Sequence, residues 1–462
     1  MTARQKAPAL ERHTQHKYIP ATDAEREEML RVIGVPSIDA LFADIPAAVQ
    51  LHRRLDLPPA LSDPEVMTHL AALAARNTHA DSAPSFLGAG AYDHYVPSVV
   101  WHLAGRGEFL TAYTPYQAEM MQGELQAGYE YQSMLCELTA MDVANASMYD
   151  GASATAEAAV MAKDVTKRSE VVVSAAVHPE YREVLRTYTR PLGVTVVEVP
   201  HRSGRTDLTA ARAALSERTA ALIIQHPNFF GSLEDGAGLA GLAHQAGALL
   251  ICAIADPLSL GLLKPPGQWG ADIVAGEGQP LGNHLNFGGP YLGMLATRQE
   301  YVRRMPGRLV GATVDTEGRR GFVLTLQTRE QHIRREKATS NICTNEALLA
   351  LAAAIYMATL GRAGFRKVAE LNLYKAVYAK ERLTALRGYR LMFDGPTFHE
   401  FVLRTPKPPE QINAALRAQG IVGGAALGRW YPDLADGWLL CVTEQRTREH
   451  IDRLVAALEG LR

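Results

Sequence analysis

The chain has 462 residues, of which 47% are hydrophobic and 21% are charged, and its formal net charge is −2. This length and composition indicate a soluble globular protein with two or three packed units and a large buried core. The near-neutral charge gives no support to a role in binding nucleic acids or anionic membranes.

The cysteines and the N-terminus bear on the compartment. The four cysteines are widely spaced and form no Cys-x-x-Cys pair, so neither a disulfide framework nor a zinc or other metal site is predicted. Residues 1–17 contain no apolar run long enough for a signal peptide, and we expect a disordered tail. No apolar stretch is expected to reach transmembrane length. A reducing cytoplasm is the predicted location.

The first 80 residues predict a helical extension. Thr22 with Glu25, and Ser62 with Glu65, have the spacing of capping boxes at the starts of two helices. The extension contains no plausible site chemistry. Such extensions more often pack on a partner or a neighbouring subunit than act alone.

Two segments rich in Gly and Tyr follow, at 86–95 and 110–119. The second crowds polar side chains into one short loop, and such loops often carry binding function. The alternative is a surface loop anchored by aromatic packing. The candidate binding residues in and just after this loop are Tyr113, Tyr116, Gln117, Glu119 and Gln122.

Strand and helix patterns alternate from 150 to 280, which predicts an α/β fold with a mainly parallel sheet covered by helices. A helix that opens with Gly151, Ala152 and Ser153 has small residues where backbone N–H groups can approach a phosphate. The same residues also permit close helix packing. Four further candidates follow predicted strands at the edge where ligands bind such sheets, so we expect them to converge: His178, Asn228, Asp256 and Gln279.

Asp256 ends the apolar run 248–255, which reads as a buried strand that delivers a carboxylate to a site. In pyridoxal-phosphate enzymes of the aminotransferase-like fold, such an aspartate binds the pyridine nitrogen of the cofactor. A lysine about twenty residues later forms the Schiff base. Gln279 stands in the place of that lysine, and residues 273–290 contain no lysine. The alternative for Asp256 is a strand-end cap before Pro257.

The remaining chain predicts a smaller C-terminal α+β domain. Residues 303–337 are rich in arginine, which favours an anion or an acidic partner, although solvated helix faces and subunit contacts are the commoner explanation. An apolar helix is expected over 345–360, ending at Gly361. The predicted domains are therefore an extension at 1–80, a large α/β domain at 81–340 and a C-terminal domain at 341–462.

Eight segments together resemble the glycine-cleavage P-protein, glycine dehydrogenase (decarboxylating). They are YTPYQ at 113–117, QGELQ at 122–126, EYQ at 130–132, ANASMYD at 144–150, HPEY at 178–181, NFGGP at 286–290, GRLV at 307–310 and REKATSNIC at 335–343. The length and the missing lysine resemble the first of two subunits found where this protein is split into two chains. The resemblance implies the aminotransferase-like pyridoxal-phosphate fold, type I.

The resemblance also implies a reaction and its partners. Glycine joined to pyridoxal phosphate loses carbon dioxide, and its aminomethyl group passes to the lipoyl arm of the H-protein. The cofactor is expected on a homologous lysine-bearing second subunit, with two copies of each chain. The pocket around Asp256 would then be vestigial, and no catalytic residue is assigned to this chain. Its contribution would come from loops that reach the partner's site.

Two other hypotheses are compatible with the residues. The chain could be a purely structural subunit that stabilises the enzyme without a part in the chemistry. It could also be a self-sufficient pyridoxal-phosphate transaminase or lyase that uses another lysine. Lys264 follows Asp256 after only eight residues, and Lys337 lies beyond the core strands, so neither position suits a Schiff base.

Overall fold

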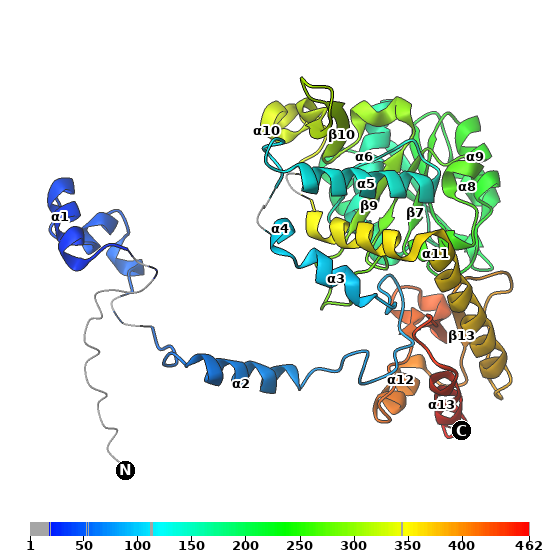
Figure 1. Cartoon of the computed structure of the whole chain (residues 1–462). Coiled ribbons are helices and arrows are strands. Elements are labelled where there is room, and N and C mark those ends of the chain that lie inside the picture. Colours follow the sequence, from blue (N-terminus) through cyan, green and yellow to red (C-terminus); the bar gives the residue numbers. More distant parts are fainter. Residues whose placement is uncertain are drawn as a thin grey trace, which may run out of the picture. The chain divides into compact units, whose positions relative to one another are not determined.

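The structure is a computed structural model, and it describes residues 18, 20–51, 53, 55–110, 114–342 and 345–461 (Figure 1). The predicted tail at 1–17, Tyr113 and Cys343 lie outside the described residues. The chain divides into two compact units, Met1–Asn77 and Thr78–Arg462. The domain boundaries expected at 80 and 340 remain predictions.

The first unit is helical, as its capping signals predicted. Both capping boxes are present, at Thr22 with Glu25 and at Ser62 with Glu65. The helical segments are α1 (Asp23–Ile33), η1 (Asp39–Phe42), η2 (Ala47–Val49) and α2 (Asp63–Ala74). None of these four segments contains a buried residue. This unit therefore has helices without a hydrophobic core beneath them.

The second unit is built on a sheet of seven strands in the order β1-β9-β8-β7-β6-β2-β3. The strands are β1 (Val143–Ala144), β2 (Glu170–Ser174), β3 (Thr195–Val199), β6 (Thr219–Gln225), β7 (Leu249–Ile254), β8 (Ile273–Glu277) and β9 (Gly293–Thr297). The four pairings among the strands from β3 to β8 are parallel, whereas β9 joins β8 and β1 antiparallel. The predicted α/β class is confirmed, but β1 and β9 lacked a clear strand signal.

Helices cover both faces of this sheet (Figure 1). Val172 and Leu250 point into one core with residues of α5 (Gln122–Thr139), α9 (Gly236–Gln245) and α11 (Ala347–Thr384). The alternate residues Val171 and Ile251 point into a second core with α6 (Gly151–Thr166) and α7 (Pro179–Thr189). Burial on both faces explains why these strands are apolar runs without alternation. The shorter helices are α3 (Ser98–Ala104), α4 (Gly107–Leu110), α8 (Leu208–Ala214) and α10 (Gln331–Arg334).

The long helix α11 contains the break predicted at Gly361, where φ is 56° and the backbone is not helical. Within the described ranges, α11 is the one helix long and apolar enough to cross a membrane by length and composition. The expectation that no stretch reaches this length was therefore wrong. Leu349, Ala352 and Tyr356 of α11 are buried in the core under the sheet, which accounts for the apolar character of the helix.

A second, antiparallel sheet follows α11, with the strand order β12-β13-β15-β14. Its strands are β12 (Arg390–Leu391), β13 (Glu400–Arg404), β14 (Ala425–Ala426) and β15 (Gly437–Cys441). The core beside it combines Phe401 and Trp438 with Ile412 of α12 (Pro409–Arg417) and Leu454 of α13 (Arg448–Glu459). This arrangement matches the α+β pattern read from the sequence.

The arginine-rich segment folds into a hairpin of β10 (Leu309–Val314) and β11 (Arg320–Thr325) with short helices after it. Its two buried arginines serve the protein itself. Arg329 donates hydrogen bonds to the carbonyls of Met305 and Gly307, and Arg308 lies 3.8 Å from Glu330. Both buried guanidinium groups are thus bound by other groups of the chain. The exposed arginines of the segment fit the commoner explanation of a solvated surface.

Candidate functional site

The candidate residues lie at the carboxyl edge of the large sheet, each placed by a strand that ends there. Asp256 follows β7 and caps the short helix η4 (Pro257–Gly261) through its hydrogen bond from the Leu258 amide. His178 lies after β2 and caps α7, and Gln279 comes two residues after β8. A single segment of the chain, 86–95, runs along this edge and contacts all three of these residues.

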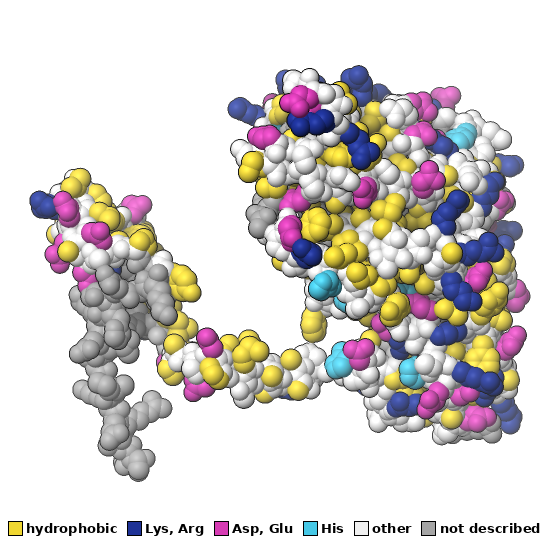
Figure 2. Space-filling model, viewed as in Figure 1, with side chains coloured by type: hydrophobic (Ala, Val, Ile, Leu, Met, Phe, Trp, Pro, Cys, Tyr) yellow, Lys and Arg dark blue, Asp and Glu magenta, His cyan; other side chains and the backbone are white. Residues whose placement is uncertain are grey.

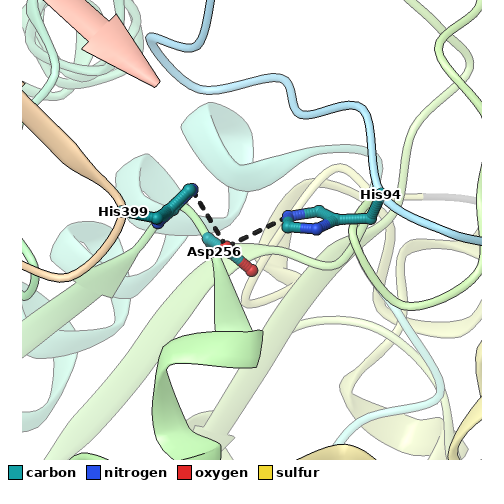
Figure 3. Close-up of side chains that lie close together, drawn as sticks. All are labelled: His94, Asp256 and His399. Carbon is teal, nitrogen blue, oxygen red and sulfur yellow. Dashed lines mark hydrogen bonds and ion pairs between the residues drawn. The ribbon is translucent and has the colours of Figure 1, made fainter. Parts of the chain in front are cut away.

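Asp256 is buried and is flanked by two histidines (Figure 3). His94 Nε2 lies 3.2 Å from Asp256 Oδ2, and His399 Nε2 lies 3.3 Å from the same oxygen. Burial would raise the pKa of Asp256, but His94 beside it holds that pKa below its usual value. Burial also lowers the pKa of His399 to about 4. The carboxylate is thus ionised and hydrogen-bonded to His94, and His399 lies against it without a hydrogen bond.

His94 stands between two carboxylates. Its Nδ1 lies 2.8 Å from Glu444 Oε2, and Glu444 also accepts a hydrogen bond from the Tyr95 amide. Burial lowers the pKa of His94, but Glu444 and Asp256 outweigh that effect and raise the pKa to about 10. Next to this group, the Tyr92 hydroxyl donates to Glu400, whose pKa burial raises to about 7. Residues 92–94 therefore fill the space in front of Asp256 with a connected polar network.

Gln279 is 1% exposed and pairs with backbone groups. Its Oε1 accepts a hydrogen bond from the Tyr92 amide at 3.0 Å, and its Nε2 donates to the Tyr92 carbonyl at 3.0 Å. The same Nε2 donates to the Asn283 carbonyl at 2.7 Å. The side-chain amide thus satisfies three buried backbone groups. It fixes segment 86–95 against the sheet, a task that a lysine could not perform because lysine has no acceptor.

His178 contacts the same segment one step earlier in the chain. Its Nε2 lies 2.8 Å from the Ala89 carbonyl oxygen. Gly90 passes so close that a Cβ at this position would lie 2.8 Å from His178 Nε2, and its φ of +101° also favours glycine. The imidazole stacks on Tyr181, with ring centroids 5.0 Å apart. The face of His178 toward the site is therefore occupied by backbone.

The N-terminus of α6 faces the Glu277 carboxyl group. The phosphate was expected at this helix end, beside Gly151, Ala152 and Ser153. The Gly151 amide donates to Glu277 Oε2 at 3.0 Å, and the Ser153 amide donates to the capping residue Asp150. Glu277 Oε1 accepts from the Gln279 and Leu292 amides. Burial raises the pKa of Glu277 to about 8 despite these three donors. The Glu277 carboxyl group thus occupies the place at this helix end where a phosphate would bind.

Asn228 does not join the other three candidates at the strand ends. Its Nδ2 donates to the Gly204 carbonyl and to Glu234, and its Oδ1 accepts from the Phe230 and Ser232 amides. These contacts hold the turn after β6, which is the structural role that an asparagine often has in a turn. The expectation that all four candidates converge was wrong for Asn228.

The polar loop has mixed exposure. Gln117 and Glu119 are exposed, and Tyr116 is 65% exposed beside Arg308. Gln122 instead bonds the β11 backbone, because its side-chain amide donates to the Phe322 carbonyl and accepts from the Phe322 amide. Gln122 is therefore engaged inside the protein, whereas Gln117 and Glu119 are exposed. Tyr113 lies outside the described residues.

Comparisons with known proteins identify the family. The family model described as glycine cleavage system P-protein matches residues 16–458. The chain belongs to the glycine cleavage system P-protein family. A probable glycine dehydrogenase (decarboxylating) subunit 1 from Desulforamulus reducens is 55% identical, over 96% of this chain and 100% of that protein. The protein of the same name from Carboxydothermus hydrogenoformans is 56% identical, over 96% and 99%.

Solved structures agree with this assignment. A crystal structure of glycine decarboxylase (P-protein) of the glycine cleavage system, in inhibitor-bound form, is 47% identical to this chain. Its TM-score is 0.88, and the match covers 97% of this chain and 100% of that one. A glutamate decarboxylase from Lactobacillus brevis is 13% identical with a TM-score of 0.67, over 90% and 96%, and shows the fold alone. The predicted family and the pyridoxal-phosphate fold type I are confirmed.

The residues of this P-protein-family chain do not fit pyridoxal phosphate. The amide of Gln279 cannot form a Schiff base, and Asp256 is hydrogen-bonded to His94 with His399 beside it. The α6 N-terminus holds Glu277. Each group that would contact the cofactor is thus already bound to the protein itself, so no reaction step is assigned to this pocket.

Sequence reasoning missed the side chains that fill the pocket. His399 and Glu444 lie far along the chain in stretches without a motif, and only the fold brings them to Asp256. Tyr92 and His94 lie in the first Gly- and Tyr-rich segment, which was noted but given no role. The glycines at 88 and 90 were the signal that could have placed this segment at the site. A glycine often marks a backbone that passes close to other groups.

Proposed function

We propose that this chain is the lysine-free subunit of a two-chain glycine decarboxylase. With its partner it decarboxylates glycine through pyridoxal phosphate and passes the aminomethyl group to the lipoyl arm of the H-protein. The observation that carries this proposal is Gln279, which stands in the place of the Schiff-base lysine and is bonded to Tyr92. The cofactor is therefore assigned to the homologous subunit 2. The chain is inactive alone and works in the cytoplasm, where its free cysteines stay reduced.

The exposed apolar side chains of the first unit favour a partner subunit. Its helices bury no residue, and large apolar side chains remain exposed along them, as the hydrophobic surface in Figure 2 illustrates. On α2, Val66, Met67, Leu70 and Leu73 form one stripe, and Leu70 is 54% exposed. A helix with such a stripe needs a covering surface. We assign subunit 2 as that surface, with two copies of each chain in a closed assembly.

Substitutions in the apolar stripe of α2 test the assembly. The full-length chain mixed with subunit 2 is expected to form one larger species in size exclusion with light scattering. Leu70→Glu should weaken the complex at least about tenfold, because burying a leucine contributes about 1.5–3 kcal/mol. Thr68→Glu places the same charge on the opposite, exposed face of the same helix and should leave the affinity nearly unchanged. Separate elution of the wild-type chains at micromolar concentration would contradict the proposal.

The polar loop is proposed to line the glycine or lipoyl-arm entrance of the partner's site. Gln117 and Glu119 are exposed polar groups beside one another, and they bond no other element that would explain their presence within the described residues. Tyr113 precedes them in the same loop. Tyr113 and Glu119 are the proposed contacts, whereas Gln122 anchors the end of the loop to β11.

The variants Tyr113→Phe and Glu119→Gln, each assembled with wild-type subunit 2, test this role. Glycine–bicarbonate exchange should fall roughly 10- to 150-fold, because a lost hydrogen bond to a charged substrate costs about 1.5–3 kcal/mol. Complex mass and cofactor content should stay normal. Glu137→Gln, at an exposed glutamate on α5, is the matched control. Unchanged exchange in both variants would favour the alternative of a purely structural subunit.

A further inference from the structure

The cluster around Asp256 joins three distant parts of the second unit. His94 comes from the segment that precedes α3, Asp256 from the end of β7, and His399 from the residue before β13. Figure 3 shows the two imidazoles on either side of the carboxylate. Side-chain exposure is 1% for His94 and 3% for the other two. Two imidazoles and one carboxylate form a donor set that first-row divalent metal ions prefer.

The spacing of the donor atoms suits one ion. His94 Nε2 and His399 Nε2 lie 3.2 and 3.3 Å from Asp256 Oδ2, and all three atoms lie within 4.8 Å of one another. Zinc bonds nitrogen and carboxylate oxygen at about 2.0–2.2 Å, so neighbouring ligands of a tetrahedral ion are about 3.3 Å apart. Two of the three donor pairs thus have the spacing of ligands on a tetrahedral zinc ion, and the third pair lies within 4.8 Å.

His399 supplies an independent observation. Among the described residues, neither ring nitrogen of this buried histidine has a hydrogen-bond partner, although Nε2 lies 3.3 Å from Asp256. A buried polar atom without a partner is costly and calls for an explanation. Two ligands of one ion point at the ion and not at each other. His399 Nε2 and Asp256 Oδ2 lie close without a hydrogen bond, as two such ligands would.

Glu444 supplies the outer contact that metal-binding histidines usually have. His94 Nδ1 lies 2.8 Å from Glu444 Oε2, so a proton kept on Nδ1 would leave the Nε2 lone pair for a bound ion. A carboxylate behind a ligating imidazole fixes its tautomer and orientation. Without an ion, the protonated imidazole pairs with both carboxylates. The cluster thus has three ligand atoms and one outer-sphere carboxylate.

We propose that His94, Asp256 and His399 bind one divalent first-row metal ion, with zinc as the reference ion. The ion ties segment 86–95 and strand β13 to the end of β7. Its role is structural, closing the pocket from within the chain. The proposal does not depend on the proposed function, because the ligands all belong to this chain and the test needs no catalysis.

The test measures zinc in the full-length chain after loading with Zn²⁺ and desalting. The wild-type chain should retain about one ion, and His399→Gln and Asp256→Asn should each bind at least about tenfold more weakly. Glu444→Gln should lose roughly 10- to 100-fold in affinity. His244→Gln is the control, because His244 makes a 2.8 Å pair with Asp272 without a second histidine. Asp256→Asn decides the result if His399→Gln misfolds.

Cobalt gives a second readout on the wild-type chain alone. Co²⁺ bound to two nitrogens and an oxygen should give a visible absorption band that zinc abolishes. Zinc should also raise the thermal midpoint of the wild-type chain by several degrees and leave that of Asp256→Asn unchanged. Retention of less than about a tenth of an ion per chain, or equal retention by both ligand variants, would overturn the proposal. The cluster would then be held by a proton on His94.

Discussion

Replacing Gln279 with leucine is expected to lower the free energy of unfolding of this chain by at least about 3 kcal/mol. The Gln279 amide satisfies the Tyr92 N–H, the Tyr92 carbonyl and the Asn283 carbonyl in a buried place. Leucine has a similar size but bonds none of them. Each buried group left without its partner costs about 1–3 kcal/mol. Urea denaturation of the full-length chain measures the change.

The exposed Gln245 at the end of α9 provides the matched control for this substitution. Gln245→Leu makes the same chemical change where water can replace the lost hydrogen bonds, so its effect should stay within about 0.5 kcal/mol. If Gln279→Leu were as mild as the control, Gln279 would not be the clamp that fixes segment 86–95 to the sheet.

Replacing Gln279 with lysine is expected not to restore a pyridoxal-phosphate site. Asp256 is hydrogen-bonded to His94 and covered by His399, and the α6 N-terminus is hydrogen-bonded to Glu277. The introduced amine would lie at the right place in the chain, but the ring and phosphate positions would stay filled. We therefore expect no internal-aldimine absorbance after incubation with the cofactor.

The same incubation with subunit 2, which carries its own lysine, is the positive control for this experiment. Borohydride reduction followed by peptide mapping distinguishes a specific adduct from random labelling of surface lysines. A stoichiometric adduct on the lysine introduced by Gln279→Lys would contradict the view that several groups, and not one missing residue, close this pocket.

The parts of the fold that follow from local patterns were predictable from the sequence. Asp256 and Gln279 stand where the apolar runs placed them, because a strand buried on both faces leaves a clear signal. The break at Gly361 was equally clear. Strands β1 and β9 escaped prediction because they are short or follow a loop, and their pairing is antiparallel across long separations in sequence.

The filling of the pocket was not predictable in the same way. A lone histidine such as His399 has no pattern around it, and its place beside Asp256 arises only when β13 packs near β7. Asn228 illustrates the opposite error. It follows a strand like the other candidates, but its local hydrogen bonds to the turn determine its role. Position at a strand end thus selects candidates, and only tertiary contacts separate site residues from turn residues.

The most direct test of the account is the location of the cofactor in the assembled enzyme. The complex of this chain with subunit 2 is loaded with pyridoxal phosphate, reduced with borohydride and mapped by mass spectrometry. The account predicts a pyridoxyl adduct on one lysine of subunit 2 and none on any lysine of this chain. A specific, stoichiometric adduct on a lysine of this chain, such as Lys264 or Lys337, would contradict it.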